Sequence, residues 1–167
     1  MTDVIDANSK AEGREFSRLP EFTKEEIGLV RGSADFMGLN YYSGEYGEPG
    51  NNLDFEAHPN PSFERDQHTR KSVDPQWPQA KSLWLRSVPS GLRQILNWIK
   101  NQYDNPEVII TENGWSDDGD IYDAGRMDYI QGHLQAVLDA IRKDRCNVTG
   151  YTYWSVIDNF EWMMGYT

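Results

Sequence analysis

The sequence predicts an α/β protein with a parallel β-sheet, and three observations support this prediction. Apolar, β-branched runs alternate along the chain with segments of helical periodicity, as they do in βαβ units. The predicted strand at 107–111 contains the run 108–110, which is apolar on both of its faces, and this is typical of a buried strand in a parallel sheet. This run ends on Glu112, directly before the turn-forming pair Asn113-Gly114.

The position of Glu112 makes it the first candidate for a functional residue. A carboxylate at the point where a buried strand meets a loop is costly unless it is hydrogen-bonded, paired or functional. In α/β proteins, ligands gather at the carboxyl ends of the strands. A salt-bridged structural glutamate is the alternative that this stretch alone leaves open.

The first half of the chain has one predicted helix and one predicted strand. Residues 1–18 are polar with a weak helical pattern, and a capping box at Thr23 and Glu26 predicts a short helix that begins there. Apolar residues predict a strand over 34–42. The segment 43–82 has little periodicity, so we expect an irregular surface excursion that carries small hairpins or borders a site.

The second half has two predicted amphipathic helices, at 90–103 and 126–145, and a further strand at 148–154. Helical spacing of apolar residues predicts the buried faces, which are Leu92, Ile95, Leu96, Ile99 and Tyr103 in the first helix and Ile130, Leu134, Val137, Leu138 and Ile141 in the second. We expect His133 at the helix surface or half-buried, and not as a ligand. The order strand, helix, strand, helix, strand predicts right-handed βαβ units.

Composition and motifs exclude several classes of function. The formal net charge of −11 argues against a nucleic-acid surface and against anionic membranes. Cys146 is the single cysteine, so neither an internal disulfide nor a thiolate metal site is expected. The chain has no apolar run of the ~18 residues that a membrane span needs. Gly-rich phosphate motifs, a serine nucleophile elbow and paired metal-binding histidines are absent from the sequence, and we expect no cofactor or metal.

The informative polar and aromatic side chains lie at or just beyond the ends of the three predicted strands. In a parallel sheet these ends point the same way, so we expect one pocket with a carboxylate at its centre. Tryptophan faces suit the C–H faces of a sugar ring, and carboxylates bind its hydroxyls, which favours glycoside hydrolysis with a carboxylate nucleophile. The residues are Asn40, Tyr42, Glu112, Trp154, Glu161 and Trp162.

Four motifs in this chain resemble those of glycoside hydrolase family 1, the retaining β-glucosidases. They occur in the family's order across nearly the whole chain, and they look closest to animal, insect-like members. The motifs are Ser17-Arg-Leu-Pro-Glu-Phe-Thr23, Asp35-Phe-Met-Gly-Leu-Asn-Tyr-Tyr42, Ile110-Thr-Glu-Asn-Gly114 and Trp154-Ser-Val-Ile-Asp-Asn-Phe-Glu-Trp162. The resemblance implies a (β/α)8 barrel, of which residues 1–167 form a carboxyl-terminal part with strands six to eight.

The resemblance also implies roles for individual residues. Glu112 falls on the family's nucleophile and Tyr42 on the tyrosine that orients it, with Asn40 in the same cluster. The glycone-binding positions fall on Glu161, Trp162 and the stacking platform Trp154, and Trp84 falls on a tryptophan that flanks the aglycone. Packing in the barrel interior remains the alternative for Tyr42, Trp84 and Trp154. The resemblance implies no metal or organic cofactor.

The sequence departs from the family in its length and in one motif. A full barrel takes about 250 residues, against 167 here, and no Asn-Glu-Pro motif for the acid/base glutamate occurs. We therefore expect this polypeptide to be inactive alone and to need the amino-terminal half of the barrel as a partner. A non-catalytic sugar-binding fragment and a thioglucosidase fragment are the alternatives. The first ten residues carry no signal-peptide core; the family resemblance is compatible with secretion, and the compartment stays open.

Overall fold

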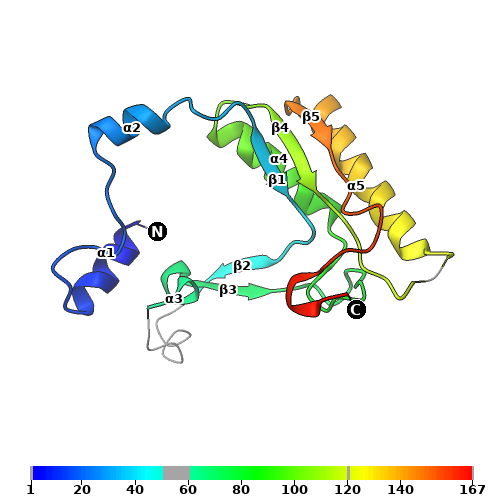
Figure 1. Ribbon diagram of the computed structural model, residues 1–167, viewed down its shortest axis with the longest axis horizontal. Coiled ribbons are helices and arrows are strands. Elements are labelled where there is room, and N and C mark those ends of the chain that lie inside the picture. Colours follow the sequence, from blue (N-terminus) through cyan, green and yellow to red (C-terminus); the bar gives the residue numbers. More distant parts are fainter. Residues whose placement is uncertain (1, 51–60, 120, 167) are drawn as a thin grey trace. The chain divides into compact units, whose positions relative to one another are not determined.

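The computed structural model describes residues 2–50, 61–119 and 121–166, and the chain divides into two compact units. The described residues of 1–33 and 45–74 form the first unit, and those of 34–44 and 75–167 form the second. All of the predicted site residues belong to the second unit, which also contains the parallel sheet (Figure 1).

The first unit is held together by a buried ion pair. Asp66 accepts two hydrogen bonds from the Arg18 guanidinium, both at 2.9 Å, and a third from Asn8 at 2.9 Å. The Arg18 guanidinium holds the pKa of the Asp66 carboxyl below its usual range. The elements of this unit are α1 (Thr2–Ala11), α2 (Lys24–Val30), β2 (Tyr46–Pro49), α3 (Phe63–Gln67) and β3 (Thr69–Ser72).

One prediction for this unit is confirmed. Thr23 and Glu26 form the predicted capping box, which opens α2 at Lys24. The segment predicted as an irregular excursion contains β2 and β3, which pair in antiparallel fashion. Residues 51–60 of this segment lie outside the described residues. That the segment 43–82 borders a site stays a prediction.

The second unit has the predicted alternation of strands and helices. Its three strands are parallel in the order β1-β4-β5, and the chain after β5 continues beyond their carboxyl ends (Figure 1). The elements are β1 (Met37–Asn40), α4 (Pro89–Gln102), β4 (Val108–Glu112), α5 (Ala124–Arg142), β5 (Val148–Tyr151) and the 3-10 turn η2 (Trp162–Met164). The structure therefore confirms an α/β architecture with a parallel sheet.

Local signals set the ends of the helices. Pro89 occupies the first turn of α4, where its missing N–H costs nothing. The Asp123 side chain accepts a hydrogen bond from the Arg126 main-chain N–H at 2.8 Å, so α5 begins earlier than predicted. None of the described helices is long and apolar enough to cross a membrane.

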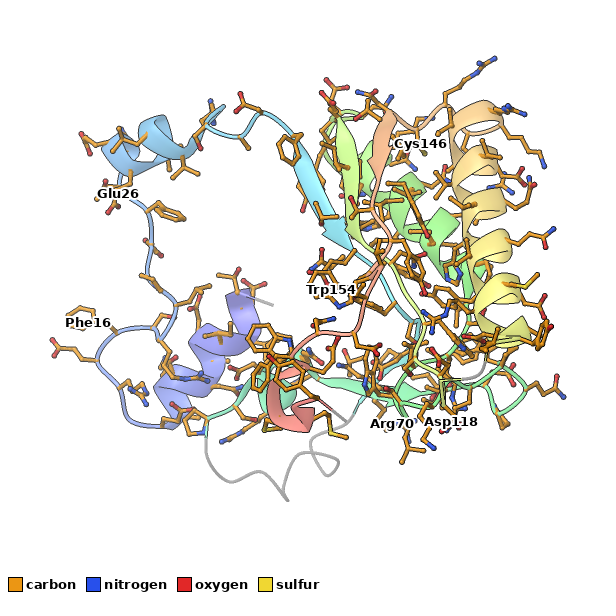
Figure 2. All side chains as sticks on the ribbon, turned by 45° about the vertical axis from the view of Figure 1, so that its right-hand side comes forward. Phe16, Glu26, Arg70, Asp118, Cys146 and Trp154 are labelled. Atoms are coloured by element: carbon orange, nitrogen blue, oxygen red, sulfur yellow. The ribbon has the colours of Figure 1, made fainter. Side chains whose placement is uncertain are left out.

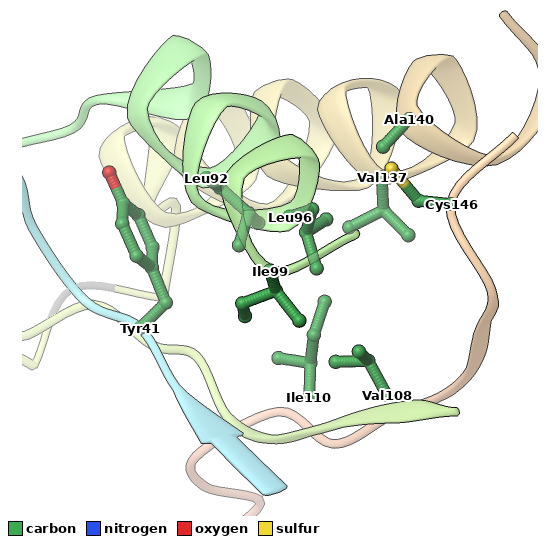
Figure 3. Packing of buried hydrophobic residues seen from close by; sticks show 9 residues of the cluster. All are labelled: Tyr41, Leu92, Leu96, Ile99, Val108, Ile110, Val137, Ala140 and Cys146. Carbon is green, nitrogen blue, oxygen red and sulfur yellow. The ribbon is translucent and has the colours of Figure 1, made fainter. Parts of the chain in front are cut away.

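The core lies between β4 and the two helices (Figure 3). Val108 and Ile110 alternate along β4 and both point toward the helices, whereas Ile109 between them is half-buried. The prediction that both faces of this strand are buried is therefore met on the helical face only. The buried cluster comprises Tyr41, Leu92, Leu96, Ile99, Val108, Ile110, Val137, Ala140 and Cys146.

The buried face of α5 differs from the predicted one. Leu134 and Leu138, predicted as core, are 38% and 40% exposed, and His133, predicted at the surface or half-buried, is 0% exposed. This face points inward because its rings have partners on other elements: the Tyr129 hydroxyl donates to the Tyr42 main-chain oxygen at 2.8 Å, and the His133 ring lies 5.9 Å from the Tyr41 ring. The residues that α5 buries are Tyr129, His133, Ala136, Val137 and Ala140.

Candidate active site

A tyrosine–glutamate hydrogen bond joins the carboxyl ends of two adjacent strands. β4 ends at Glu112, and Tyr42 lies two residues beyond the end of β1. The Tyr42 hydroxyl donates to Oε2 of Glu112 at 2.7 Å. Burial raises the pKa of the Tyr42 phenol, and its bond to the Glu112 carboxylate raises it further. Tyr42 is therefore a neutral donor across the physiological pH range, and it fixes one oxygen of the carboxylate.

The chain after β5 adds a second carboxylate and an indole. The Trp154 indole N–H donates to Oε1 of Glu161 at 3.2 Å, and Trp154 lies on the segment that leaves the sheet (Figure 2). The Glu161 charge also raises the pKa of Tyr42, so this carboxylate lies within electrostatic reach of the Tyr42–Glu112 pair. Side chains from the ends of β1 and β4 and from the segment after β5 thus lie in one region.

The remaining predicted residues lie at the margin of this region. Asn40 accepts a hydrogen bond from the Thr111 hydroxyl at 2.6 Å and thus contacts the residue before Glu112. Trp84 meets Tyr42 edge-on, with ring centroids 5.9 Å apart, and is 63% exposed, which does not fit the core-packing alternative. Trp162 begins η2 and is 83% exposed.

Behind Glu112 lies a buried cluster of hydrogen bonds that sequence reasoning missed. The Asn113 side-chain amide donates to the Tyr41 main-chain oxygen at 2.6 Å and to the Tyr129 hydroxyl at 2.8 Å. Its amide oxygen accepts from the Tyr151 hydroxyl at 2.7 Å. The sequence indicates Asn113 only as a turn residue. The sequence signal for this cluster is the spacing of Tyr129 and His133, which puts two polar rings on one helix face.

Gly114 is required by a close approach of two chain segments. The Trp154 N–H donates to the Asn113 carbonyl oxygen at 2.9 Å, which brings the segment after β5 against the segment after β4. A Cβ atom at position 114 would overlap the Trp154 carbonyl oxygen. Only glycine lets the chain beyond Glu112 pass this close to the chain beyond β5.

A separate hollow of about 840 Å³ lies between α4 and α5, on the helical side of the unit, and it contains none of the predicted site residues. Its charges are already paired, since Arg93 binds Asp144 with two hydrogen bonds of 2.6 and 2.7 Å.

Among the described residues, no group of three or more His, Cys, Asp or Glu could hold a metal ion.

The comparison with protein families identifies the family of this chain. The family model described as Glycosyl hydrolase family 1 matches residues 5–167. The chain belongs to glycosyl hydrolase family 1. It is therefore classified among the glycoside hydrolases, and the family resemblance predicted from the four motifs is confirmed.

Curated members of family 1 from several organisms are similar to this chain. Myrosinase 1 of Brevicoryne brassicae is 45% identical over 168 residues, which cover 100% of this chain and 35% of that protein. The Lactase-like protein of Homo sapiens is 38% identical, and the match covers 100% of this chain and 29% of that protein. The chain thus spans about a third of the length of these relatives.

Solved structures of family 1 members also match. The aphid myrosinase structure gives a TM-score of 0.87 at 45% identity, covering 99% of this chain and 35% of that chain. The rice Os3BGlu6 β-glucosidase gives 0.78 at 32% identity, covering 99% of this chain and 37% of that chain. These neighbours are TIM-barrel proteins, so the α/β unit with its parallel sheet is of the TIM-barrel type.

Proposed function

We propose that this chain carries the nucleophile half of a retaining β-glycosidase, with Glu112 as the nucleophile. The observation that supports this most strongly is the 2.7 Å hydrogen bond from Tyr42 to Glu112 at the carboxyl ends of neighbouring parallel strands. Catalytic residues of (β/α)8 barrels lie at this end of the strands. We assign β1, β4 and β5 to barrel strands six, seven and eight.

In this proposal one carboxylate oxygen of Glu112 attacks the anomeric carbon of a β-glucoside while the glycosidic C–O bond breaks and the aglycone leaves. The product is a glycosyl ester of Glu112, which water then hydrolyses. The Tyr42 hydroxyl keeps the carboxylate in one orientation, which lowers the entropy cost of attack. Trp154 stacks on the sugar ring, while Glu161, Trp162 and Asn40 bind its hydroxyls and Trp84 flanks the aglycone.

The proposed reaction needs a second carboxylate. Retaining glycosidases place an acid/base carboxyl about 5–5.5 Å from the nucleophile, and the family's Asn-Glu-Pro motif does not occur in these 167 residues. We propose that the other part of the barrel supplies it. General acid–base catalysis contributes typically ~10²–10⁴-fold, so the 167 residues alone should show no useful turnover.

The test is hydrolysis of an aryl β-glucoside by the complete polypeptide that contains this chain. We expect Glu112→Gln to lower kcat/KM by roughly 10⁴-fold, because the substituted amide cannot form the glycosyl ester. Glu107→Gln is the matched control: Glu107 immediately precedes β4 at its amino end, where it accepts a hydrogen bond from Thr149 at 2.7 Å. Equal activity of the parent and Glu112→Gln would overturn the assignment of Glu112 as the nucleophile. Efficient hydrolysis by the isolated 167-residue chain would overturn the proposal that another part of the barrel supplies the acid/base carboxyl.

Sugar binding without turnover is the second candidate, and the Trp154–Glu161 pair favours it. This pair offers a stacking surface and a hydroxyl acceptor without any need for Glu112 chemistry. Calorimetric titration with glucose, combined with the activity assay, separates the two functions. A binding module binds glucose both as the parent protein and as Glu112→Gln, and the parent protein shows no turnover; a glycosidase shows turnover that Glu112→Gln loses. Parallel assays with O-linked and S-linked glucosides distinguish β-glucosidase from thioglucosidase activity.

A further inference from the structure

The Tyr129 hydroxyl connects the two segments that carry Tyr42 and Glu112. It donates to the main-chain carbonyl oxygen of Tyr42 at 2.8 Å. It also accepts from the Asn113 side-chain amide at 2.8 Å, and Asn113 directly follows Glu112 in the chain. The opposite side of that amide is held by the Tyr151 hydroxyl at 2.7 Å. One phenol on α5 thus contacts the residue after the carboxylate and the tyrosine that orients it.

We propose that Tyr129 is a positioning residue for the nucleophile and that it acts through Tyr42 and Asn113. By holding both chain segments, its hydroxyl maintains the 2.7 Å separation between the Tyr42 hydroxyl and Oε2 of Glu112. This inference rests on the proposed role of Glu112 as nucleophile. It adds a residue that lies behind the carboxylate and that the four sequence motifs do not contain.

Tyr129 is itself held rigidly, which the proposed role requires. It is 1% exposed, its ring stacks on His133 with centroids 3.9 Å apart, and Trp115 packs beside it at 5.2 Å. Burial raises the pKa of the Tyr129 phenol, so it remains a donor toward the Tyr42 carbonyl oxygen. A donor fixed on a long helix defines the positions of its partners better than a side chain on a loop can.

Loss of this hydroxyl should move the catalytic pair and not only weaken the fold. The Tyr42 carbonyl oxygen and the Asn113 amide would both lose a buried partner, and each then gains by shifting toward another one. The carbonyl oxygen belongs to Tyr42 itself, and Asn113 is the residue after Glu112, so both groups adjoin the Tyr42–Glu112 bond. A displacement of about 1 Å at reacting groups can cost about 10²-fold in rate.

The test measures how fast Glu112 is trapped in the complete polypeptide. The reagent is 2,4-dinitrophenyl 2-deoxy-2-fluoro-β-glucoside. A carboxylate oxygen of Glu112 would attack its anomeric carbon, displace dinitrophenolate and form a stable glycosyl ester. Dinitrophenolate leaves without protonation, so the rate reports the nucleophile and not the acid step. We expect Tyr129→Phe to slow the maximal trapping rate about tenfold while the half-saturating reagent concentration stays unchanged.

Tyr41→Phe is the matched control. The Tyr41 hydroxyl is also buried and also donates to a main-chain oxygen at 2.8 Å, but its acceptor is Val88, the N-cap residue of α4. The substitution keeps the Tyr41 main-chain oxygen that accepts from Asn113. Its removal should lower stability similarly and leave trapping at the parent rate. Tyr151→Phe, which removes only the outer bond to Asn113, should slow trapping in the same direction by less, and it replaces Tyr129→Phe if that variant does not fold.

The outcomes separate the two proposals. Trapping in Tyr129→Phe at the parent rate, or slowed no more than in Tyr41→Phe, overturns the positioning role and leaves the nucleophile in place. If Tyr129→Phe does not fold, parent-rate trapping in Tyr151→Phe has the same meaning. If mass spectrometry finds no sugar on Glu112 in the parent protein, the proposed function fails and this inference fails with it.

Discussion

At the scale of single residues, the site combines one half-buried bond with several buried ones. The Tyr42–Glu112 bond lies at the strand ends, whereas Asn113 and His133 behind it are 0% exposed. Asn113 bonds the Tyr41 main-chain oxygen and two tyrosine hydroxyls, and His133 bonds the Tyr129 carbonyl oxygen through Nδ1, while its Nε2 has no hydrogen-bond partner in the described part of the chain. Such a network is rigid when its hydrogen bonds are complete, and it becomes unfavourable when one member changes its charge.

His133 should make the stability of the protein depend on pH. Burial lowers its pKa to about 4, against about 6.5 in an unfolded chain. Between these values the unfolded state binds more protons than the folded state, so stability is full above pH 6.5 and falls as the pH falls toward 4. We expect this residue to remove about 2 kcal/mol of unfolding free energy between pH 7 and pH 5.

The measurement is urea unfolding at both pH values for the parent and for His133→Gln. Glutamine can keep a polar contact to the Tyr129 carbonyl oxygen but does not titrate. Other groups affect both proteins equally, so the difference between the two pH dependences isolates His133. An identical loss of stability in parent and variant would refute the prediction.

At the scale of elements, the two helices were predicted with different success. In α4 the predicted apolar positions Leu92, Leu96 and Ile99 are buried, because apolar packing decides that face. The prediction was wrong for Tyr103, which is the C-cap residue of α4 and is 53% exposed. In α5 the apolar pattern predicted the wrong face, since Tyr129 takes a core position through hydrogen bonds to Tyr42 and Asn113, and His133 packs against Tyr41. Periodicity finds an apolar stripe, but it gives no weight to a polar ring that obtains partners only in the folded state.

Alanine substitutions should distinguish the buried from the exposed leucines. Leu96 is 1% exposed and lies in the core beside β4, so Leu96→Ala should cost about 2–5 kcal/mol. Leu138 is 40% exposed, and Leu138→Ala should cost less than about 1.5 kcal/mol because much of its side chain already contacts solvent. Chemical denaturation of both variants checks this, and equal losses of unfolding free energy would contradict the exposure of Leu138 on α5.

At the scale of the whole chain, apolar surface and net charge act in opposite directions. The residues around η2 include Ile157 and Met163, which are 76% and 100% exposed. Among the described strands, β1 and β5 each pair on one side only. Exposed apolar groups and open strand edges favour association with other chains, while a net charge of −11 opposes it.

We expect the isolated 167-residue chain to self-associate, and to do so more strongly as salt is added. Salt screens the repulsion between acidic chains, with a Debye length that falls from about 30 Å at 0.01 M to about 3 Å at 1 M, whereas burial of apolar surface is not screened. Static light scattering across a salt series measures the average mass. A double variant with Ile157→Lys and Met163→Lys serves as the control and should scatter less; a monomer at every salt concentration would refute the expectation.

The sequence by itself determined the order of strands and helices, the ends of several elements and the location of Glu112 at a strand end. These features depend on periodicity, on caps such as Thr23 with Glu26 and on turn-forming pairs, all of which act between near neighbours in the chain. Only the tertiary structure decided that Tyr129 bonds both the Tyr42 carbonyl oxygen and the Asn113 amide behind that carboxylate. Tyr42 and Tyr129 are 87 residues apart, and a hydrogen bond between distant residues is specified by the packing of whole elements.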